Sequence, residues 1–330
     1  MKAVVISRPG GPDVLDVREI DRPEPGTNEV LVCVRATALN RADLMQREGR
    51  YPAPPGAPAD IPGLEFAGEV AALGPGAHEW REGARVFGIT GGGAYAEYLA
   101  VHERTLAPIP TTLGWDEAAA VPEAFITAHD ALVTQAAVRA SERVLIHAVG
   151  SGVGLAATQL ARAFGAVPFG TSRTGDKIAR ARELGLEDGV ALGRDPGALA
   201  DAVARWTNRR GVDVVLDLVG GAYVQAGVEA LAPRGRLILI GTVAGAQTSL
   251  DLRRVLTGRL TIRGTVLRAR PLEEKILATR AFAAEVVPLF ERRIVRPVID
   301  SSFPLTEIAA AHRHLESNAT FGKVVLRVAG

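Results

Sequence analysis

A glycine-rich turn between a predicted strand and a predicted helix constrains the fold of this chain more than any other feature. Residues 143–149 (RVLIHAV) are mostly apolar, and residues 155–164 carry apolar side chains at helical spacing. The turn between them contains Gly150, Ser151, Gly152, Val153 and Gly154. Backbone N–H groups of such a turn, with the positive end of the following helix, can bind a pyrophosphate. Because the G-x-G-x-x-G spacing is absent, a turn without a ligand is the alternative.

Composition and charge narrow the class of protein. The 330 residues suffice for two ordinary domains, and 47% hydrophobic with 23% charged residues is typical of a globular enzyme. Lys+Arg total 38 and Asp+Glu 37, so the net charge is +1, and no nucleic-acid partner is expected. The sequence predicts no membrane span and no signal peptide. The one cysteine, Cys33, allows no internal disulfide and fits a cytoplasmic protein.

The pattern of strands and helices divides the chain into three regions. Residues 1–118 read as short strands separated by Gly and Pro, whereas residues 119–266 alternate strand and helix. Runs such as VDVVLDLV suit strands buried on both faces, which predicts a doubly wound parallel sheet. Residues 267–330 are too few for a confident core of their own. We therefore expect an α/β protein in which 1–118 and 267–330 form one discontinuous β-rich domain, and 119–266 a nucleotide-binding domain.

The stretch after the second strand of the nucleotide-binding domain indicates which nucleotide is bound. In such folds an acid at this place reads a ribose 2′-hydroxyl, while cationic or small residues accept a 2′-phosphate. Residues 170–177 read GTSRTGDK, with no carboxylate at the strand end. Ser172, Arg173 and Lys177 can instead surround a phosphate, which favours NADPH over NADH. The alternative is that both cations are ordinary solvated charges.

Several longer stretches resemble a known family. They are LNRADLMQREGRYP, PGLEFAGEV, GGGAYAEYLAV, EAFITAHDAL, HAVGSGVG and FGKVVLRV, in an order that spans nearly the whole chain. The chain resembles the zinc-free NADPH:quinone oxidoreductases (zeta-crystallin-like) of the medium-chain dehydrogenase/reductase superfamily, and most of all their p53-inducible branch. The resemblance implies a GroES-like substrate domain, a Rossmann domain that binds NADPH, and a homodimer.

The resemblance also bears on metal binding. In the zinc alcohol dehydrogenases of this superfamily, three zinc ligands lie in segments that match those around Asn40, Leu64 and Glu123. Asn40 and Leu64 cannot serve as such ligands, and catalytic zinc requires three from the protein. We therefore expect no metal and no alcohol oxidation. Reduction of a quinone or an enone needs only positioning and a few hydrogen bonds, because the acceptor delocalises the added charge.

Four residues are candidates for the catalytic site. The resemblance places Asn40 near the nicotinamide and the acceptor oxygen, and Thr127 against the nicotinamide. Asp43 either orients this loop or caps the helix that begins there. Tyr51, in a proline-rich segment, could stack on a flat acceptor and donate a hydrogen bond. The structural alternatives are a turn-forming Asn and a Tyr that packs within its loop.

The remaining cofactor contacts are predicted from strand ends and from the resemblance. Residues that follow the fourth, fifth and sixth strands of the nucleotide-binding domain are Leu218, Gly241 and Val266. In the family, one segment near the end of the chain closes over the cofactor. The residues that resemble it here are Phe321, Gly322 and Lys323. Many relatives have a tyrosine over the adenine where this chain has Gly193 and Arg194.

Three functions are compatible with these features. The first is an NADPH-dependent quinone reductase. The second is a reductase of enones, enals or enoyl thioesters, which shares the fold and the cofactor. The third, from a different class, is a crystallin-like protein that binds NADPH without turnover.

Overall fold

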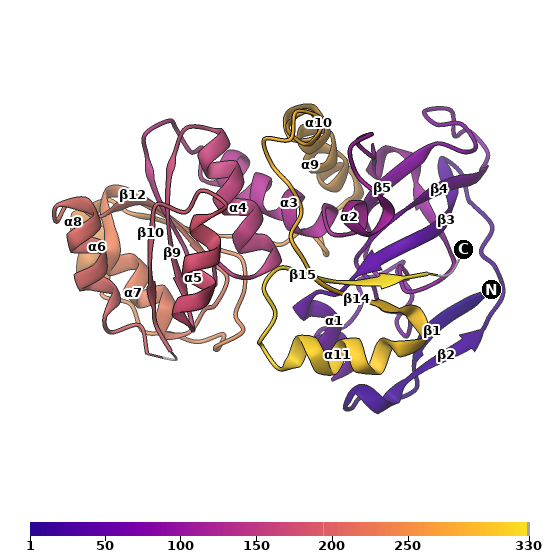
Figure 1. Ribbon diagram of the computed structural model, residues 1–330, viewed down its shortest axis with the longest axis horizontal. Coiled ribbons are helices and arrows are strands. Elements are labelled where there is room, and N and C mark those ends of the chain that lie inside the picture. The colour runs from indigo at the N-terminus through magenta and orange to yellow at the C-terminus, as the bar shows by residue number, and fades with distance from the viewer. Residues whose placement is uncertain (194, 329–330) are drawn as a thin grey trace. The chain divides into compact units, whose positions relative to one another are not determined.

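The computed structural model describes residues 1–193 and 195–328, and the chain divides into two compact units (Figure 1). Unit 1 comprises Met1–Ile126 with Leu267–Gly330, and unit 2 comprises Thr127–Val266. The first boundary therefore falls after residue 126 and not after residue 118 as the sequence predicted. The reason is that the residues after α2 (Trp115–Ala119) also contact unit 1: the backbone N–H of Glu123 donates to Glu65, and the ring centre of Phe125 lies 4.8 Å from that of Phe290.

Unit 1 is built mainly from strands. Its strands are β1 (Lys2–Ile6), β2 (Leu15–Glu19), β3 (Glu29–Ala38), β4 (Glu65–Leu73), β5 (Arg85–Ile89), β6 (Tyr98–His102), β7 (Leu106–Pro108), β14 (Ile299–Pro304) and β15 (Lys323–Arg327). Besides α2, its helices are α1 (Arg41–Arg47), α9 (Leu272–Glu285), α10 (Val287–Glu291) and α11 (Ile308–Glu316). Short 3₁₀ turns lie at Pro12–Val14, Glu103–Thr105 and Leu305–Glu307. Helix α3 (Pro122–His129) runs across the boundary into unit 2.

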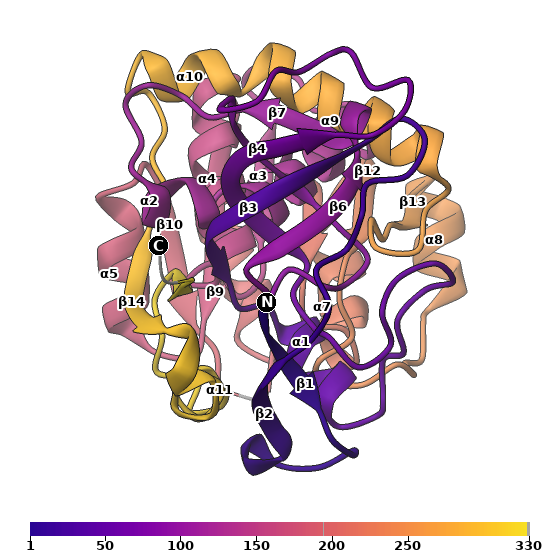
Figure 2. The same ribbon diagram turned by 90° about the vertical axis from the view of Figure 1, so that its right-hand side faces the viewer.

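The main sheet of unit 1 is organised on β3, which crosses its middle (Figure 2). The strand order is β14-β15-β3-β4-β5-β7, and β6 also pairs with β3. Strand β15, from the end of the chain, pairs antiparallel with β3 so that Val325 lies opposite Ala38. The buried core includes Val32, Phe66 and Leu326. The last residues of the chain thus supply an interior strand beside the end of β3, where Leu39 and Asn40 follow.

Unit 2 alternates strands and helices. Its strands are β8 (Arg143–Ile146), β9 (Val167–Ser172), β10 (Asp188–Ala191), β11 (Val212–Asp217), β12 (Leu231–Leu239) and β13 (Thr261–Gly264). Its helices are α4 (Gly152–Ala163), α5 (Gly175–Arg182), α6 (Leu199–Thr207), α7 (Ala222–Ala230) and α8 (Leu252–Gly258), and a π-helical segment, Asp130–Gln135, follows α3. All pairs in the order β10-β9-β8-β11-β12-β13 are parallel, which confirms the predicted doubly wound sheet.

Helices α9 and α10 are separate, and Pro288 lies in the first turn of α10. Proline has no N–H to continue the hydrogen bonds of a preceding helix, and it fits a helix start.

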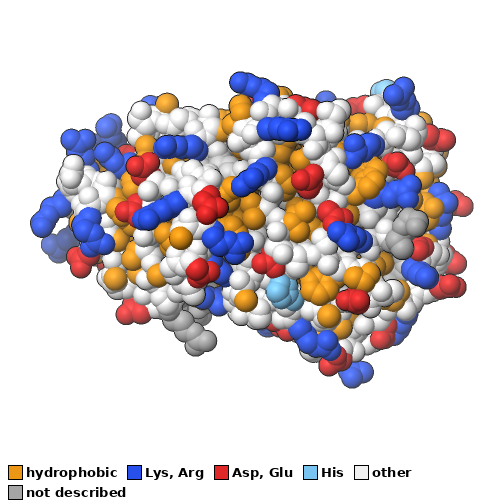
Figure 3. Space-filling model, in the orientation of Figure 1, with side chains coloured by type: hydrophobic (Ala, Val, Ile, Leu, Met, Phe, Trp, Pro, Cys, Tyr) orange, Lys and Arg blue, Asp and Glu red, His pale blue; other side chains and the backbone are white. Residues whose placement is uncertain are grey.

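The distribution of charged side chains on the surface agrees with the near-neutral net charge. Basic and acidic side chains are interspersed over the face in Figure 3, in contrast to the continuous basic stripe that nucleic-acid binding uses. Among the described residues, no helix has both the length and the apolar character needed to cross a membrane.

Candidate functional site

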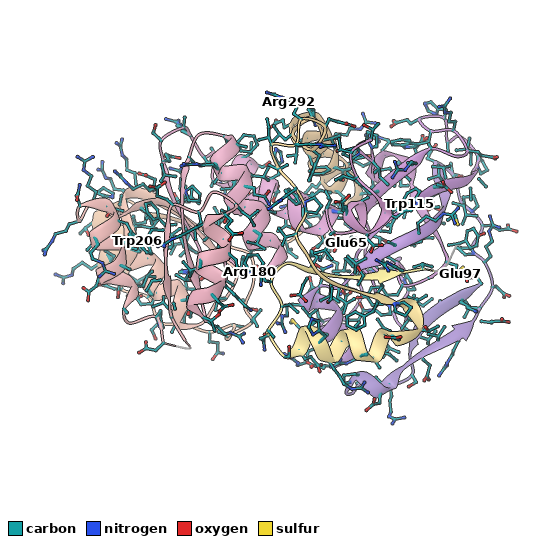
Figure 4. The ribbon with its side chains drawn as sticks, viewed as in Figure 1. Glu65, Glu97, Trp115, Arg180, Trp206 and Arg292 are labelled. Carbon is teal, nitrogen blue, oxygen red and sulfur yellow. The ribbon has the colours of Figure 1, made fainter. Side chains whose placement is uncertain are left out.

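A fully buried carboxylate, Glu65, organises the polar groups in the interior of unit 1 (Figure 4). Its Oε1 accepts a hydrogen bond from Asn40 Nδ2 at 2.8 Å and pairs with Lys323 Nζ at 2.6 Å. Its Oε2 accepts a hydrogen bond from the backbone N–H of Glu123 at 2.8 Å. Segments that are far apart in the sequence, namely the end of β3, the start of β15 and the start of α3, therefore meet at one side chain.

Each of the three N–H donors of the Lys323 ammonium has an oxygen partner. Besides Glu65, Lys323 Nζ donates to Asn40 Oδ1 at 2.6 Å and to the carbonyl of Leu39 at 2.8 Å. An ammonium has three donors and no acceptor, so Asn40 must present its carbonyl oxygen to Lys323 and its NH₂ group to Glu65. The amide of Asn40 is thereby fixed in orientation while its side chain remains only partly buried. The sequence predicted that Lys323 contacts the cofactor. In the structure these three contacts of Lys323 all lie within unit 1.

Asp43 both caps α1 and orients the adjoining loop. Its Oδ2 accepts from the backbone N–H of Asn40 at 2.7 Å and from the hydroxyl of Tyr95 at 3.0 Å. Its Oδ1 accepts from the backbone N–H of Gly63, at the end of the proline-rich segment, at 3.2 Å. Burial raises the pKa of Asp43 to about 6, and these hydrogen bonds oppose that rise. The carboxylate therefore ties the segment after β3 to the loop that contains Tyr51.

Tyr51 is held by an arginine that the sequence analysis missed. Arg268 is 5% exposed, and its guanidinium carbon lies 4.9 Å from the centre of the Tyr51 ring. The guanidinium donates to the carbonyls of Tyr51 at 3.3 Å and Gly91 at 2.8 Å and to Gln46 Oε1 at 2.6 Å. Burial raises the pKa of Tyr51, so its hydroxyl stays protonated at neutral pH. No local pattern marks Arg268, because each of its partners lies far away in the sequence.

Glu123 lies beside this cluster and is partly exposed. Burial raises the pKa of Glu123 to about 8, and the negative charges of Glu65 and Asp43 raise it further, while the cations Lys323 and Arg268 oppose the rise. Unit 1 thus contains a carboxyl group that is largely neutral at pH 7. The sequence predicted no catalytic role for Glu123, whose segment matches one that carries a zinc ligand in the zinc alcohol dehydrogenases.

The glycine turn of unit 2 has the geometry of a strand–turn–helix. Residues 150–153 connect β8 to the first turn of α4, and Ser151 Oγ caps the helix by accepting from the N–H of Gly154 at 3.1 Å. A Cβ on Gly154 would lie 2.6 Å from the carbonyl oxygen of Ala148, so only glycine lets helix and strand approach this closely. These features fit a dinucleotide whose pyrophosphate lies at the helix N-terminus.

A buried histidine beneath this turn was also missed. His147 is fully buried, and its Nδ1 lies 3.0 Å from the hydroxyl oxygen of Thr171. Burial lowers the pKa of His147 to about 4, against the opposing charge of Asp217. Asp217 Oδ1 in turn accepts from the backbone N–H groups of Val219 at 2.8 Å and Gly220 at 2.9 Å. The neutral His147 thus connects the end of β8 to β9, and the carboxylate of Asp217 holds the loop that follows β11.

The residues predicted to bind the 2′-phosphate lie at the end of β9, directly after it, and in the first turn of α5. Ser172 is the buried last residue of β9, Arg173 is exposed, and Lys177 lies in the first turns of α5. The charge of Arg173 acts on Tyr223, whose hydroxyl donates to the carbonyl of Leu192 at 3.0 Å. Tyr223 donates also to the carbonyl of Gly193 at 3.3 Å, whereas Arg194 lies outside the described residues.

The other predicted cofactor contacts separate between the two units. In unit 2, a Cβ on Gly241 would lie 2.8 Å from the carbonyl oxygen of Leu218, so the loops after β12 and β11 adjoin. Val266 is 49% exposed and Thr127 is buried in α3. In unit 1, the N–H of Phe321 donates to Asp300 Oδ1 at 2.8 Å. Gly322 has φ +103°, and a Cβ there would lie 2.3 Å from the carbonyl oxygen of Val298.

Comparison with known families and proteins gives matches over the whole chain. The family described as alcohol dehydrogenase GroES-like domain matches residues 26–111, and the family described as zinc-binding dehydrogenase matches residues 188–326. A quinone oxidoreductase of Pseudomonas aeruginosa is 34% identical over 98% of this chain and 99% of its own length. A phthioceranic/hydroxyphthioceranic acid synthase of Mycobacterium tuberculosis is 35% identical over 98% of this chain but only 15% of its own length.

Solved structures agree with this chain over its full length. A structure described as an NAD-dependent alcohol dehydrogenase has a TM-score of 0.87 at 34% identity and covers 100% of both chains. A mycobacterial protein complexed with NADPH has a TM-score of 0.88 at 28% identity, covering 99% of this chain and 100% of its own.

The side chains of this chain do not fit the zinc named in one of these family descriptions. Within the described residues, no three His, Cys, Asp or Glu side chains are grouped so that they could hold a metal ion. Leu64 is apolar and buried, and the oxygen of the Asn40 amide accepts from Lys323. The charge of Glu65 is neutralised by an ammonium group, so we derive no chemistry from zinc.

Replacing Lys323 by methionine tests the buried ion pair. In Lys323→Met the carboxylate of Glu65 stays buried without its cation, and we expect a loss of about 3–5 kcal/mol in the free energy of unfolding. The double variant Lys323→Met/Glu65→Gln removes both charges and should recover part of this loss. Denaturant unfolding measures both effects, with Lys2→Met, at an exposed position in β1, as the control. Losses that simply add in the double variant would contradict the coupling.

Proposed function

We propose, from the premise that this chain belongs to the quinone oxidoreductase family of medium-chain dehydrogenases/reductases, that it reduces quinones with NADPH and without zinc. The observation that carries this proposal is the fixed amide of Asn40. It is held between Glu65 at 2.8 Å and Lys323 at 2.6 Å, and these two side chains form an ion pair.

The groups of unit 1 suit an electron-poor acceptor. The second N–H of the Asn40 amide has only a long contact, 3.4 Å to the carbonyl of Ala38, and is therefore available to donate to an acceptor oxygen. The protonated hydroxyl of Tyr51 is a second donor. When bound, NADPH supplies the hydride. Two neutral donors suffice for an acceptor that spreads the added charge over a conjugated ring, whereas an alkoxide would need a stronger Lewis acid.

The choice of NADPH rests on the end of β9. Ser172, Arg173 and Lys177 offer a hydroxyl and two cations, and the nearest acid in this stretch, Asp176, lies within the first turn of α5 and not at the strand end. The structural relative that is complexed with NADPH supports the same choice.

The double variant Arg173→Ala/Lys177→Ala tests this assignment. Removing charge-assisted hydrogen bonds to a 2′-phosphate costs roughly 1.5–3 kcal/mol each. The KM for NADPH should therefore rise at least about tenfold, whereas the KM for NADH should stay nearly constant. Steady-state kinetics with both nucleotides measures the ratio, and Arg180→Ala, further along α5, serves as the control. An equal rise for both nucleotides would refute a phosphate site at these residues.

Turnover of different acceptors tests the reaction itself. NADPH oxidation is measured with ortho- and para-quinones and, in parallel, with enones, enals and an enoyl thioester. We expect the quinones to give the higher kcat/KM. The alternative, reduction of a conjugated carbon–carbon double bond, has support from a solved structure described as an enoyl reductase, which is 26% identical to this chain with a TM-score of 0.88, and a preference for the alkenes would establish it. Tight binding of NADPH with no turnover of either class would instead indicate a binding protein.

We also propose that the protein is a homodimer that functions in the cytoplasm. Strand β13 lies at one end of the sheet of unit 2 and all its residues are exposed. Ile262 on β13 and Leu252 and Leu256 on the neighbouring α8 are 38%, 72% and 78% exposed. An exposed edge strand with apolar neighbours is suited to pairing with the same strand of a second copy. The single cysteine fits a reducing compartment.

Sedimentation of surface variants tests the homodimer. In Leu256→Glu/Ile262→Lys, charges replace the apolar side chains of this edge, and we expect a monomer. Leu277→Glu changes an equally apolar residue on α9 of unit 1 that is 67% exposed, and it should leave the dimer intact. A dimer that persists in the double variant, or a wild-type monomer, would contradict this interface.

A further inference from the structure

We propose that Glu123 is the catalytic acid that delivers the final proton to the reduced acceptor, an inference that rests on the proposed quinone reduction. In unit 1 the backbone of Glu123 and the amide of Asn40 bind the two oxygens of the same carboxylate, Glu65.

The position of Glu123 is set by the same carboxylate that orients Asn40. Glu65 Oε2 accepts from the backbone N–H of Glu123, while Glu65 Oε1 accepts from the amide of Asn40. Glu65 is fully buried, whereas Asn40 and Glu123 are both partly exposed. Pro122, the first residue of α3, further fixes the backbone at this point. Asn40 and Glu123, which are both partly exposed, are therefore positioned by one buried carboxylate.

The charges that act on Glu123 come from each neighbouring element. Glu65 on β4 and Asp43 on α1 are anionic, and Lys323 on β15 and Arg268 before α9 are cationic. Burial and the two carboxylates prevail over the cations, so the pKa of Glu123 is about 8.

Two further groups face Glu123 within unit 1. The ammonium of Lys275 on α9 and the phenol of Tyr51 both sense its charge. Burial lowers the pKa of Lys275, and the charge of Glu123 opposes that shift. Tyr51 therefore lies within range of the charge of Glu123, and its backbone carbonyl accepts from Arg268.

The other acids of the cluster are less suited to this task. A general acid works best when its pKa lies near the working pH. Burial raises the pKa of the Tyr51 phenol above its ordinary value of 10, and Asp43 is fully buried and accepts three hydrogen bonds. Glu123 combines a pKa near neutral pH with a position that is only partly buried.

The step balances with the proposed reaction. The quinone gains two electrons and one proton as a hydride from C4 of the nicotinamide, where a C–H bond breaks. The resulting quinol anion takes its second proton from the carboxylic acid of Glu123, whose O–H bond breaks as a new O–H bond forms. The carboxylate that remains is stabilised by Lys323 and Arg268, and it regains a proton from water at its exposed side.

The variant Glu123→Gln tests the acid by kinetics. It keeps the shape of the side chain but has no proton to donate, so kcat with a quinone should fall about 100-fold at neutral pH, with the KM for NADPH unchanged. The kcat of the wild type should decline as the pH rises through about 8, where Glu123 ionises, and the kcat of the variant should not. The control is Glu82→Gln, at an exposed position between β4 and β5.

Thermal unfolding gives a second readout that does not depend on activity. An unfolded glutamate ionises near its ordinary pKa of 4.5, whereas folded Glu123 keeps its proton up to about 8. Between these values the folded state binds the extra proton, so the contribution of Glu123 to stability is lost as the pH rises and is constant above 8. The Tm of Glu123→Gln minus that of the wild type should therefore increase from about pH 5 to about pH 8 and then level.

These measurements distinguish a failure of the acid role of Glu123 from a failure of the proposed quinone reduction. Loss of kcat with a flattened pH profile and a rising Tm difference supports Glu123 as the acid. Unchanged kcat in Glu123→Gln overturns the role while quinone reduction by the wild type stands. A Tm difference that does not change with pH overturns it too, since Glu123 would then be ionised already at neutral pH. If the wild type does not reduce quinones with NADPH, the proposed function fails and the acid role fails with it.

Discussion

The buried ion pair between Glu65 and Lys323 is the constraint on which unit 1 depends. A carboxylate removed from water is stable only if cations and hydrogen-bond donors surround it, and here Lys323, Asn40 and the backbone of Glu123 fill that role. The hydrogen bonds and the ion pair of Glu65 fix where the end of β3, the start of α3 and β15 must lie. The strand from the end of the chain is therefore an integral part of the unit that forms at its beginning.

The contacts of the Lys323 ammonium decide which chemistry this arrangement suits. A metal ion would act as a Lewis acid on an alkoxide, whereas Lys323 is saturated by three oxygen acceptors and cannot bind a substrate oxygen in addition. The groups that remain are neutral donors, the amide of Asn40 and the phenol of Tyr51, with the carboxylic acid of Glu123 beside them. Such groups fit an acceptor that delocalises charge and then needs one proton.

The sequence predicts what depends on local pattern. The glycine turn, the apolar parallel strands and the capping role of Asp43 follow from residues within a few positions of one another, and the structure agrees with them. Arg268 and His147 could not be recognised, because their roles depend on partners in distant segments. Lys323 was predicted as a cofactor contact from its motif, yet its partners in unit 1 are fixed by the pairing of β15 with β3, which periodicity does not reveal.

A crystal structure of the protein with NADPH and a quinone analogue that cannot be reduced would test the account most directly. We expect an oxygen of the analogue within hydrogen-bonding distance of Asn40 Nδ2, the carboxyl group of Glu123 adjacent to it, and Lys323 still on Glu65. A metal ion bound at Glu65, or an analogue that binds away from Asn40 with Lys323 turned to the cofactor, would contradict the account.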